Sequence, residues 1–162
     1  MEFTDIAMEL SKEAWQASFH HPFVLQLQEG TLEPSIFRYY LIQDAYYLKS
    51  FSEAYHLLAD KTSNEEMKRF LKQNAQSLVE GELFIRQQFF MELGISDQEM
   101  EQHPIAPTCY HYISHIYRQF AETNLGIAFA SLLPCPWLYH DLGKALNRKP
   151  SPNPLYQQWI ET

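Results

Sequence analysis

The sequence predicts an all-α fold, organised as a single domain over residues 1–162. Apolar residues recur at helical spacing in one segment after another, and short loops separate these segments. Only five glycines are present, which argues against a protein of strands and hairpins and against phosphate-binding loops. Because 46% of the residues are hydrophobic, the chain can bury one sizeable core, and a helical bundle is expected.

Charge and composition limit the classes of binding partner that we expect for this protein. The formal net charge is −8 and the basic residues are not clustered, so we do not expect a nucleic acid partner. We find no signal peptide and no apolar run long enough to cross a bilayer, and therefore expect a cytoplasmic protein with no membrane partner. The two cysteines, Cys109 and Cys135, lack the spacing of a metal or redox motif.

The first helix is expected to begin at an N-cap, Thr4, and to end before His20 and His21. A short helix, residues 23–28, should follow and stop at Gly30, because glycine accepts the left-handed conformation after a helix. The two adjacent histidines allow two interpretations. They are either ligands of a metal or heme, or a turn with ordinary hydrogen bonds.

A long helix is predicted from Pro34 to Asp60, and its apolar stripe contains one carboxylate, Asp44. Charged groups rarely lie within such a stripe unless they are paired. Asp44 is therefore either an interior residue satisfied by tyrosine hydroxyls or an acceptor for a polar group of a ligand. The stripe consists of Phe37, Tyr40, Leu41, Tyr47, Leu48, Phe51, Tyr55 and Leu58.

The next helix should start at Ser63 or Asn64 and continue to Leu93, with Ser63 and Glu66 spaced as a capping box. Gly81 lies inside this helix, where glycine is unfavourable, and we interpret it as a point of close helix packing. Its neighbours Glu80 and Glu82 are either solvated or include one that points inward.

Two further helical segments precede the proline-rich region. Residues 96–100 form a capped turn, and a helix then carries His111 and His115 four residues apart, as in zinc sites. The glutamate of the zinc motif is missing, so these histidines more simply belong to an aromatic helix with polar tips. The aromatic and apolar positions of that helix are Tyr110, Tyr112, Ile116, Tyr117 and Phe120.

Cys135 stands between two prolines, Pro134 and Pro136, which interrupt a helical pattern. We expect one helix to end or kink near Pro134 and the next to begin at Pro136. A helix N-terminus presents unpaired N–H groups and a positive dipole end, which favour the nucleophilic thiolate. The alternative is a small buried thiol at a structural kink. A further amphipathic segment begins with Tyr156, Trp159 and Ile160.

Five segments, distributed along the whole chain, resemble the TenA family of thiaminase II or aminopyrimidine aminohydrolase enzymes. The most specific are the neighbourhoods of Asp44 and of Pro-Cys135-Pro. The segments are Ser18-Phe-His-His21-Pro-Phe, Phe37-Arg-Tyr-Tyr-Leu-Ile-Gln-Asp44-Ala-Tyr-Tyr47-Leu, Ser114-His-Ile-Tyr-Arg, Ala130-Ser-Leu-Leu-Pro-Cys135-Pro-Trp-Leu-Tyr139 and Pro154-Leu-Tyr-Gln-Gln-Trp-Ile.

The resemblance implies a heme-oxygenase-like helical fold, a homotetramer, and no metal or organic cofactor. It implies thiamine salvage by hydrolysis of 5-aminomethyl-4-amino-2-methylpyrimidine to hydroxymethyl pyrimidine, and also cleavage of thiamine. By analogy, Cys135 is the nucleophile and Tyr47 hydrogen-bonds and tunes it. Asp44 would hold the ring nitrogen and the exocyclic amine, and Tyr112 and Tyr139 would line the pocket and orient the ring.

These residue types suit that chemistry. A thiolate can add to an electron-poor pyrimidine and divide one difficult displacement into two easier steps. A carboxylate can accept two hydrogen bonds from the edge of an aminopyrimidine. Tyrosine rings can stack on the heterocycle, and their hydroxyls supply donors.

One departure from the family concerns the C-terminus. Family members continue for several helices that carry a further stacking tyrosine and a proton-donating glutamate. We therefore expect a chain truncated at its C-terminus, with weak pyrimidine binding and poor turnover. Two other classes remain open: a metal-dependent oxidoreductase, because Glu53 and His56 match half of a di-iron signature, and a non-catalytic pyrimidine-binding or regulatory module.

Overall fold

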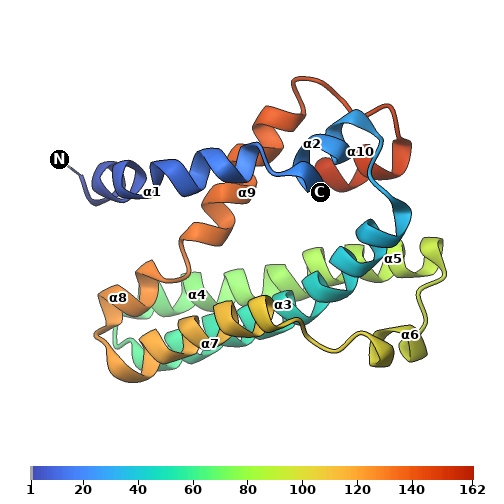
Figure 1. Cartoon of the computed structure of the whole chain (residues 1–162). Coiled ribbons are helices and arrows are strands. Elements are labelled where there is room, and N and C mark those ends of the chain that lie inside the picture. Colours follow the sequence, from blue (N-terminus) through green and yellow to red (C-terminus); the bar gives the residue numbers. More distant parts are fainter. Residues whose placement is uncertain (1) are drawn as a thin grey trace. The chain divides into compact units, whose positions relative to one another are not determined.

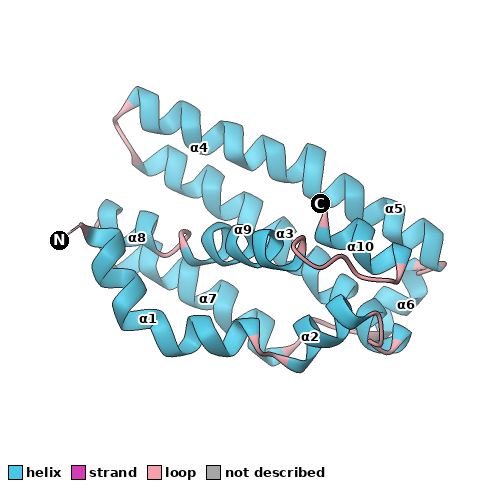
Figure 2. Ribbon diagram, turned by 90° about the horizontal axis from the view of Figure 1, so that it is seen from above, coloured by secondary structure: helices cyan, strands magenta, loops and turns pink. Residues whose placement is uncertain are grey.

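The computed structural model describes residues 2–162, and within them every regular element is a helix (Figure 2). The predicted all-α fold is therefore confirmed. The chain divides into two compact units. One contains the chain up to Glu33 together with Cys135–Thr162, and the other is Pro34–Pro134. None of the helices within residues 2–162 combines the length and the apolar character that a membrane span requires.

Among its described residues, the unit formed by the two ends of the chain contains four helices, labelled in Figure 1. Trp15 and Trp137 make an edge-to-face contact, with ring centroids 5.5 Å apart. The Tyr156 hydroxyl donates a 2.6 Å hydrogen bond to the Leu32 carbonyl, and this tyrosine is only 2% exposed. The two ends are thus joined by ring packing and a buried hydrogen bond. The helices are α1 (Phe3–Phe19), α2 (Pro22–Glu29), α9 (Pro134–Leu146) and α10 (Pro154–Ile160).

The helix boundaries of this unit follow the local sequence closely. Gly30 ends α2 in the left-handed conformation, with φ of 74°, as predicted. The predicted N-cap Thr4 is wrong, because α1 begins at Phe3 and its N-cap is Glu2, two residues before the predicted cap. The reason is a capping box in which the Asp5 carboxylate accepts a 3.0 Å hydrogen bond from the Glu2 backbone N–H.

The junction at Cys135 also differs from the prediction. The helix starts at Pro134 rather than at Pro136, so Cys135 is its second residue. Both prolines are tolerated because the first four N–H groups of a helix have no partner within the helix. Cys135 therefore lies in the first turn of α9, and its side chain is half-buried.

The second unit is built around α3 (Pro34–Lys61), which contacts α4 and α7 (Figure 1). Twelve residues of α3 are buried, and Phe37 meets Phe89 edge-to-face at 6.1 Å. This helix therefore carries much of the core of the unit. The other elements are α4 (Glu65–Ser77), the π-helix η1 (Leu78–Leu83), α5 (Phe84–Leu93), α6 (Asp97–Gln102), α7 (Pro107–Glu122) and α8 (Leu125–Ala130).

The long helix predicted to run to Leu93 exists as one continuous rod from α4 to α5 (Figure 2). Within it, η1 is π-helical and interrupts the α-helical geometry. Asn64 caps it by accepting from the Met67 N–H, so the predicted box of Ser63 and Glu66 is wrong. The packing interpretation of Gly81 is also wrong, because a Cβ there would meet no atom within 4 Å. Gly81 instead lies within the π turn.

Candidate active site

Asp44 is buried in the middle of α3, and its partner is Arg86 of α5. The guanidinium Nε donates to the Asp44 Oδ2 across 42 residues of sequence. Asp44 is 9% exposed and Arg86 6% exposed, so this is a buried ion pair. The sequence predicted the buried carboxylate correctly, but neither interpretation of Asp44 anticipated an arginine partner.

A second carboxylate, Glu82, contacts the same guanidinium. Its Oε2 lies 3.5 Å from Nη2 of Arg86, which is four residues further along the chain. Glu80 is exposed and accepts a hydrogen bond from Gln76 at 2.7 Å. Of the two glutamates beside Gly81, Glu82 is thus directed toward the buried pair and Glu80 toward solvent.

The protonation equilibria of this cluster are displaced from their ordinary values. Burial raises the pKa of the Asp44 carboxyl, and the charge and hydrogen bond of Arg86 oppose that rise. Burial also raises the pKa of Glu82, again against the effect of Arg86. For Arg86, burial lowers the pKa but the neighbouring acids outweigh it, so the pKa is raised and the guanidinium stays charged.

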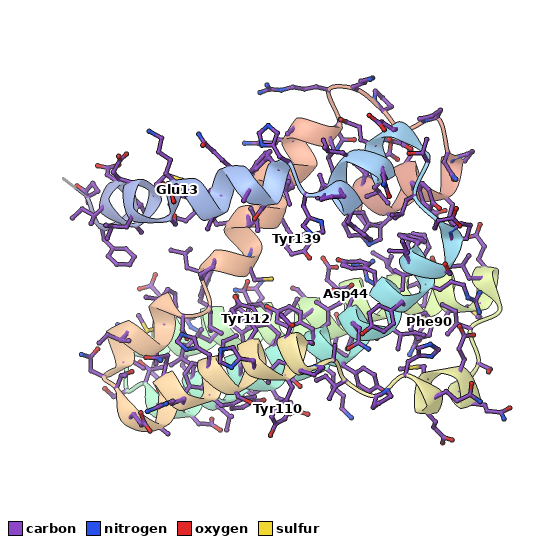
Figure 3. All side chains as sticks on the ribbon, viewed as in Figure 1. Glu13, Asp44, Phe90, Tyr110, Tyr112 and Tyr139 are labelled. Atoms are coloured by element: carbon purple, nitrogen blue, oxygen red, sulfur yellow. The ribbon has the colours of Figure 1, made fainter. Side chains whose placement is uncertain are left out.

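Tyr47 and Tyr112 come together through their rings. The ring of Tyr47, on α3, stacks on that of Tyr112, on α7, at 5.7 Å and an interplanar angle of 16°. It also stacks on Phe51, at 5.1 Å. Figure 3 shows Tyr112 and Tyr110 leaving α7 on opposite sides, and Tyr110 is 62% exposed. The ring of Tyr47 is thus packed against two other rings, one helical turn beyond Asp44.

The residue before Asp44, Gln43, holds the segment that leads into α7. Its side-chain amide donates to the Pro104 carbonyl at 3.2 Å and accepts from the Ala106 N–H at 2.7 Å. Cys109 lies near the Gln43 carbonyl, with a sulfur-to-oxygen distance of 3.8 Å. Burial raises the pKa of the Cys109 thiol, and the charge of Asp44 adds to this effect. These contacts fix the start of α7 against α3.

In the other unit, Cys135 and Tyr139 lie one turn apart on α9. Tyr139 is 44% exposed, and its ring meets that of Trp159 edge-to-face at 6.5 Å. Trp159 in turn packs edge-to-face on Phe23 at 6.4 Å. The thiol and the tyrosine thus lie on a helix that is packed by aromatic rings from α1 and α10.

The histidines make local contacts. Nδ1 of His20 is 2.7 Å from the Gln16 carbonyl, and Nδ1 of His21 accepts from the Phe23 N–H at 3.2 Å. This is the hydrogen-bonded turn that the sequence allowed. His111 and His115 are exposed. Within residues 2–162, no three histidine, cysteine or acidic side chains are grouped so that they could hold a metal ion.

Arg86 is the residue that sequence reasoning missed. It lies on the predicted helix beside apolar residues, where a charge is unusual, and that anomaly was its only signal. Gln43 was missed too, because an amide next to a carboxylate carries no spacing that identifies its role.

The chain is similar to proteins of known family. The pattern of the TENA/THI-4/PQQC family matches residues 10–162. An aminopyrimidine aminohydrolase of Bacillus subtilis (strain 168) is 35% identical over 162 residues, which cover 100% of this chain and 69% of that protein. An aminopyrimidine aminohydrolase of Halalkalibacterium halodurans is 28% identical, over 99% of this chain and 73% of its own.

Solved structures agree with this likeness. A TenA homologue protein from P. horikoshii OT3 has a TM-score of 0.91 and 25% identity, and the match covers 99% of this chain and 76% of that one. The resemblance to TenA proteins found in the sequence is thereby confirmed. The chain belongs to the TENA/THI-4/PQQC family.

Proposed function

We propose that this protein is an aminopyrimidine aminohydrolase of thiamine salvage. The reaction replaces the C–N bond of 5-aminomethyl-4-amino-2-methylpyrimidine by a C–O bond, consumes one water and releases ammonia. The observation that carries the proposal is the buried Asp44 carboxylate one turn from the stacked tyrosines, in a chain 35% identical to an aminopyrimidine aminohydrolase. A carboxylate accepts from the amine edge of the heterocycle, and tyrosine rings cover its face.

Asp44 is the proposed substrate acceptor. An ionised carboxylate has two oxygens and about four lone-pair directions, and the Nε–H of Arg86 uses only part of this capacity. A two-point contact with the ring nitrogen and the exocyclic amine is thus compatible with the ion pair. Tyr112 and Tyr139 are the proposed ring-orienting residues.

Cys135 is the proposed nucleophile. It lies in the first turn of a 13-residue helix, where the dipole and the N–H groups favour a thiolate. Addition of the thiolate to the ring would allow ammonia to leave, and attack of water would then give the hydroxymethyl product and return the thiolate. We assign to Tyr47 the role of tuning the reactivity of Cys135. The same chemistry would cleave thiamine. We also propose that the protein works as a homotetramer in the cytoplasm.

The test compares Cys135→Ser with the wild-type chain, and Cys109→Ser is the matched control because it removes the other thiol. Ammonia release from the aminomethyl pyrimidine is measured together with ligand affinity by calorimetry. We expect Cys135→Ser to lose at least about a thousandfold in rate and to retain ligand binding, because a hydroxyl is a far weaker nucleophile. Cys109→Ser should hydrolyse at close to the wild-type rate. Hydrolysis at wild-type rate by Cys135→Ser would overturn the nucleophile, and no ammonia from the wild-type chain would overturn the activity.

A further inference from the structure

The ion pair between Asp44 and Arg86 calls for an explanation, because burying it brings little stability. Removing two charges from water is costly, and apolar residues of similar volume are often as stabilising as a buried pair. Both residues are nevertheless less than 10% exposed, in the core of the second unit. Since Asp44 is also the proposed substrate acceptor, its partner is a candidate for a functional role.

The position of the guanidinium is fixed from two directions. Its Nε contacts the Asp44 Oδ2 from α3, while its Nη2 lies 3.5 Å from the Glu82 Oε2 of η1. A planar guanidinium held by two carboxylates from different elements has little freedom to rotate. The carboxylate that it contacts is held in one orientation for the same reason.

The backbone around Arg86 is unusual as well. Leu78–Leu83 form a π-helical stretch immediately before α5, and Arg86 is the third residue of α5. Such turns are rare and occur frequently at functional sites. Here the turn carries Glu82, the second acid on the guanidinium.

We propose that Arg86 is a positioning residue for Asp44, holding this carboxylate ionised and correctly oriented for the donor edge of an aminopyrimidine. The inference rests on the proposed function, and it assigns Arg86 no contact with the substrate. Four groups surround the carboxylate or its partner: Arg86 on α5, Glu82 on η1, Cys109 on α7, and Tyr40 on α3, which interacts with Arg86. Arg86 is the only cation among these four, so its loss should make Asp44 harder to ionise.

The experiment uses the reaction product, 4-amino-5-hydroxymethyl-2-methylpyrimidine, as a probe that cannot be hydrolysed further. Its dissociation constant is measured by calorimetry from pH 5 to pH 8. Titration of the Asp44 carboxyl is followed by NMR of protein labelled with ¹³C in its aspartate carboxyls, and Asp44→Asn assigns the signal. The matched control is Arg38→Gln, which removes the ion pair between Arg38 and Glu99 in the same unit.

In Arg86→Gln, we expect the titration midpoint of Asp44 to rise and the probe to bind at least about tenfold more weakly at pH 6. Arg86→Lys keeps the charge without the planar Nε–H donor, so its midpoint should stay near the wild-type one while binding still weakens several-fold. Arg38→Gln should change neither quantity.

Wild-type affinity and an unchanged midpoint in folded Arg86→Gln would overturn the inference. If Arg86→Gln does not fold, Arg86→Lys decides, and wild-type binding by that variant rejects the orienting role. Failure of the wild-type chain to bind the probe would refute the proposed function instead. In that case a raised Asp44 midpoint in Arg86→Gln would still support the control of Asp44 ionisation by Arg86.

Discussion

Two glycines with the same backbone conformation allow a sharp test of the packing at Gly30. Gly30 has φ of 74° and Gly94 has φ of 64°, and each ends a helix. A Cβ on Gly30 would lie 2.8 Å from Cγ of Pro152, whereas a Cβ on Gly94 would meet no atom within 4 Å. Substitution by alanine thus adds backbone strain at both positions but a steric clash at only one.

The magnitudes follow from these distances. The left-handed conformation costs a residue with a Cβ about 1–2 kcal/mol, and the stiffer unfolded chain of an alanine variant returns about 0.4–1 kcal/mol. Gly94→Ala should therefore lose about 1 kcal/mol of unfolding free energy. Overpacking against Pro152 adds about 1–3 kcal/mol, so Gly30→Ala should lose about 2–4 kcal/mol.

Urea denaturation followed by circular dichroism measures both free energies, and a double variant isolates the clash. Pro152→Ala removes the Cγ atom and leaves the Asn153 backbone nitrogen, 3.3 Å from the added Cβ, as the one close neighbour. In that background the cost of Gly30→Ala should therefore fall most of the way toward that of Gly94→Ala. Equal losses for the two glycine variants in the wild-type background would refute the steric argument. So would an unchanged cost of Gly30→Ala after removal of the proline ring.

Two further predictions concern buried polar groups. Tyr156→Phe removes the donor to the Leu32 carbonyl and should lower the unfolding free energy by about 1–3 kcal/mol, because a buried acceptor loses its partner. The control Tyr110→Phe, at an exposed tyrosine, should change the unfolding free energy by less than about 0.5 kcal/mol. Equal effects of the two variants in urea denaturation would contradict a stabilising role of the Tyr156 hydrogen bond. The second prediction concerns pH. Because burial raises the pKa of Asp44 in the folded state, the native protein binds this proton more tightly than the unfolded chain does. The resulting stabilisation is complete at pH values below the ordinary aspartate pKa, and it is lost as pH rises through the raised pKa. The unfolding free energy of the wild type relative to Asp44→Asn should accordingly fall with rising pH, and a relative stability that increases with pH would show that the pair with Arg86 outweighs burial.

Local sequence accounts for most helix boundaries. Gly30 ends a helix as predicted, and Gly94 ends another in the same left-handed conformation, which depends on the glycine itself. Asn124 and Ser96 cap helices through their own side chains. The errors at Thr4, Ser63 and Pro136 are shifts of one or two residues. At the first two positions another residue caps the helix, Glu2 through its box with Asp5 and Asn64 through its side chain. At the third, Pro134 is accepted as the first helical residue.

Two other features could not be predicted locally. No residue of Leu78–Leu83 by itself requires a π turn, since Gly81 is compatible with an ordinary α-helix as well. The stacking of Tyr47 on Tyr112 depends on how α3 and α7 pack, although each ring was correctly assigned to its helix. Such contacts depend on the distance between helices rather than on spacing along one of them.

The sequence by itself determined that the chain is all-α, that it resembles TenA proteins, and that Asp44 lies in a buried stripe, because helical periodicity and capping act within a few residues. Only the tertiary structure decided that Arg86 is the partner of Asp44 and that Glu82 faces the same guanidinium. A buried charge must be paired, but its partner is chosen by the packing of α3 against α5, which brings together residues 42 positions apart.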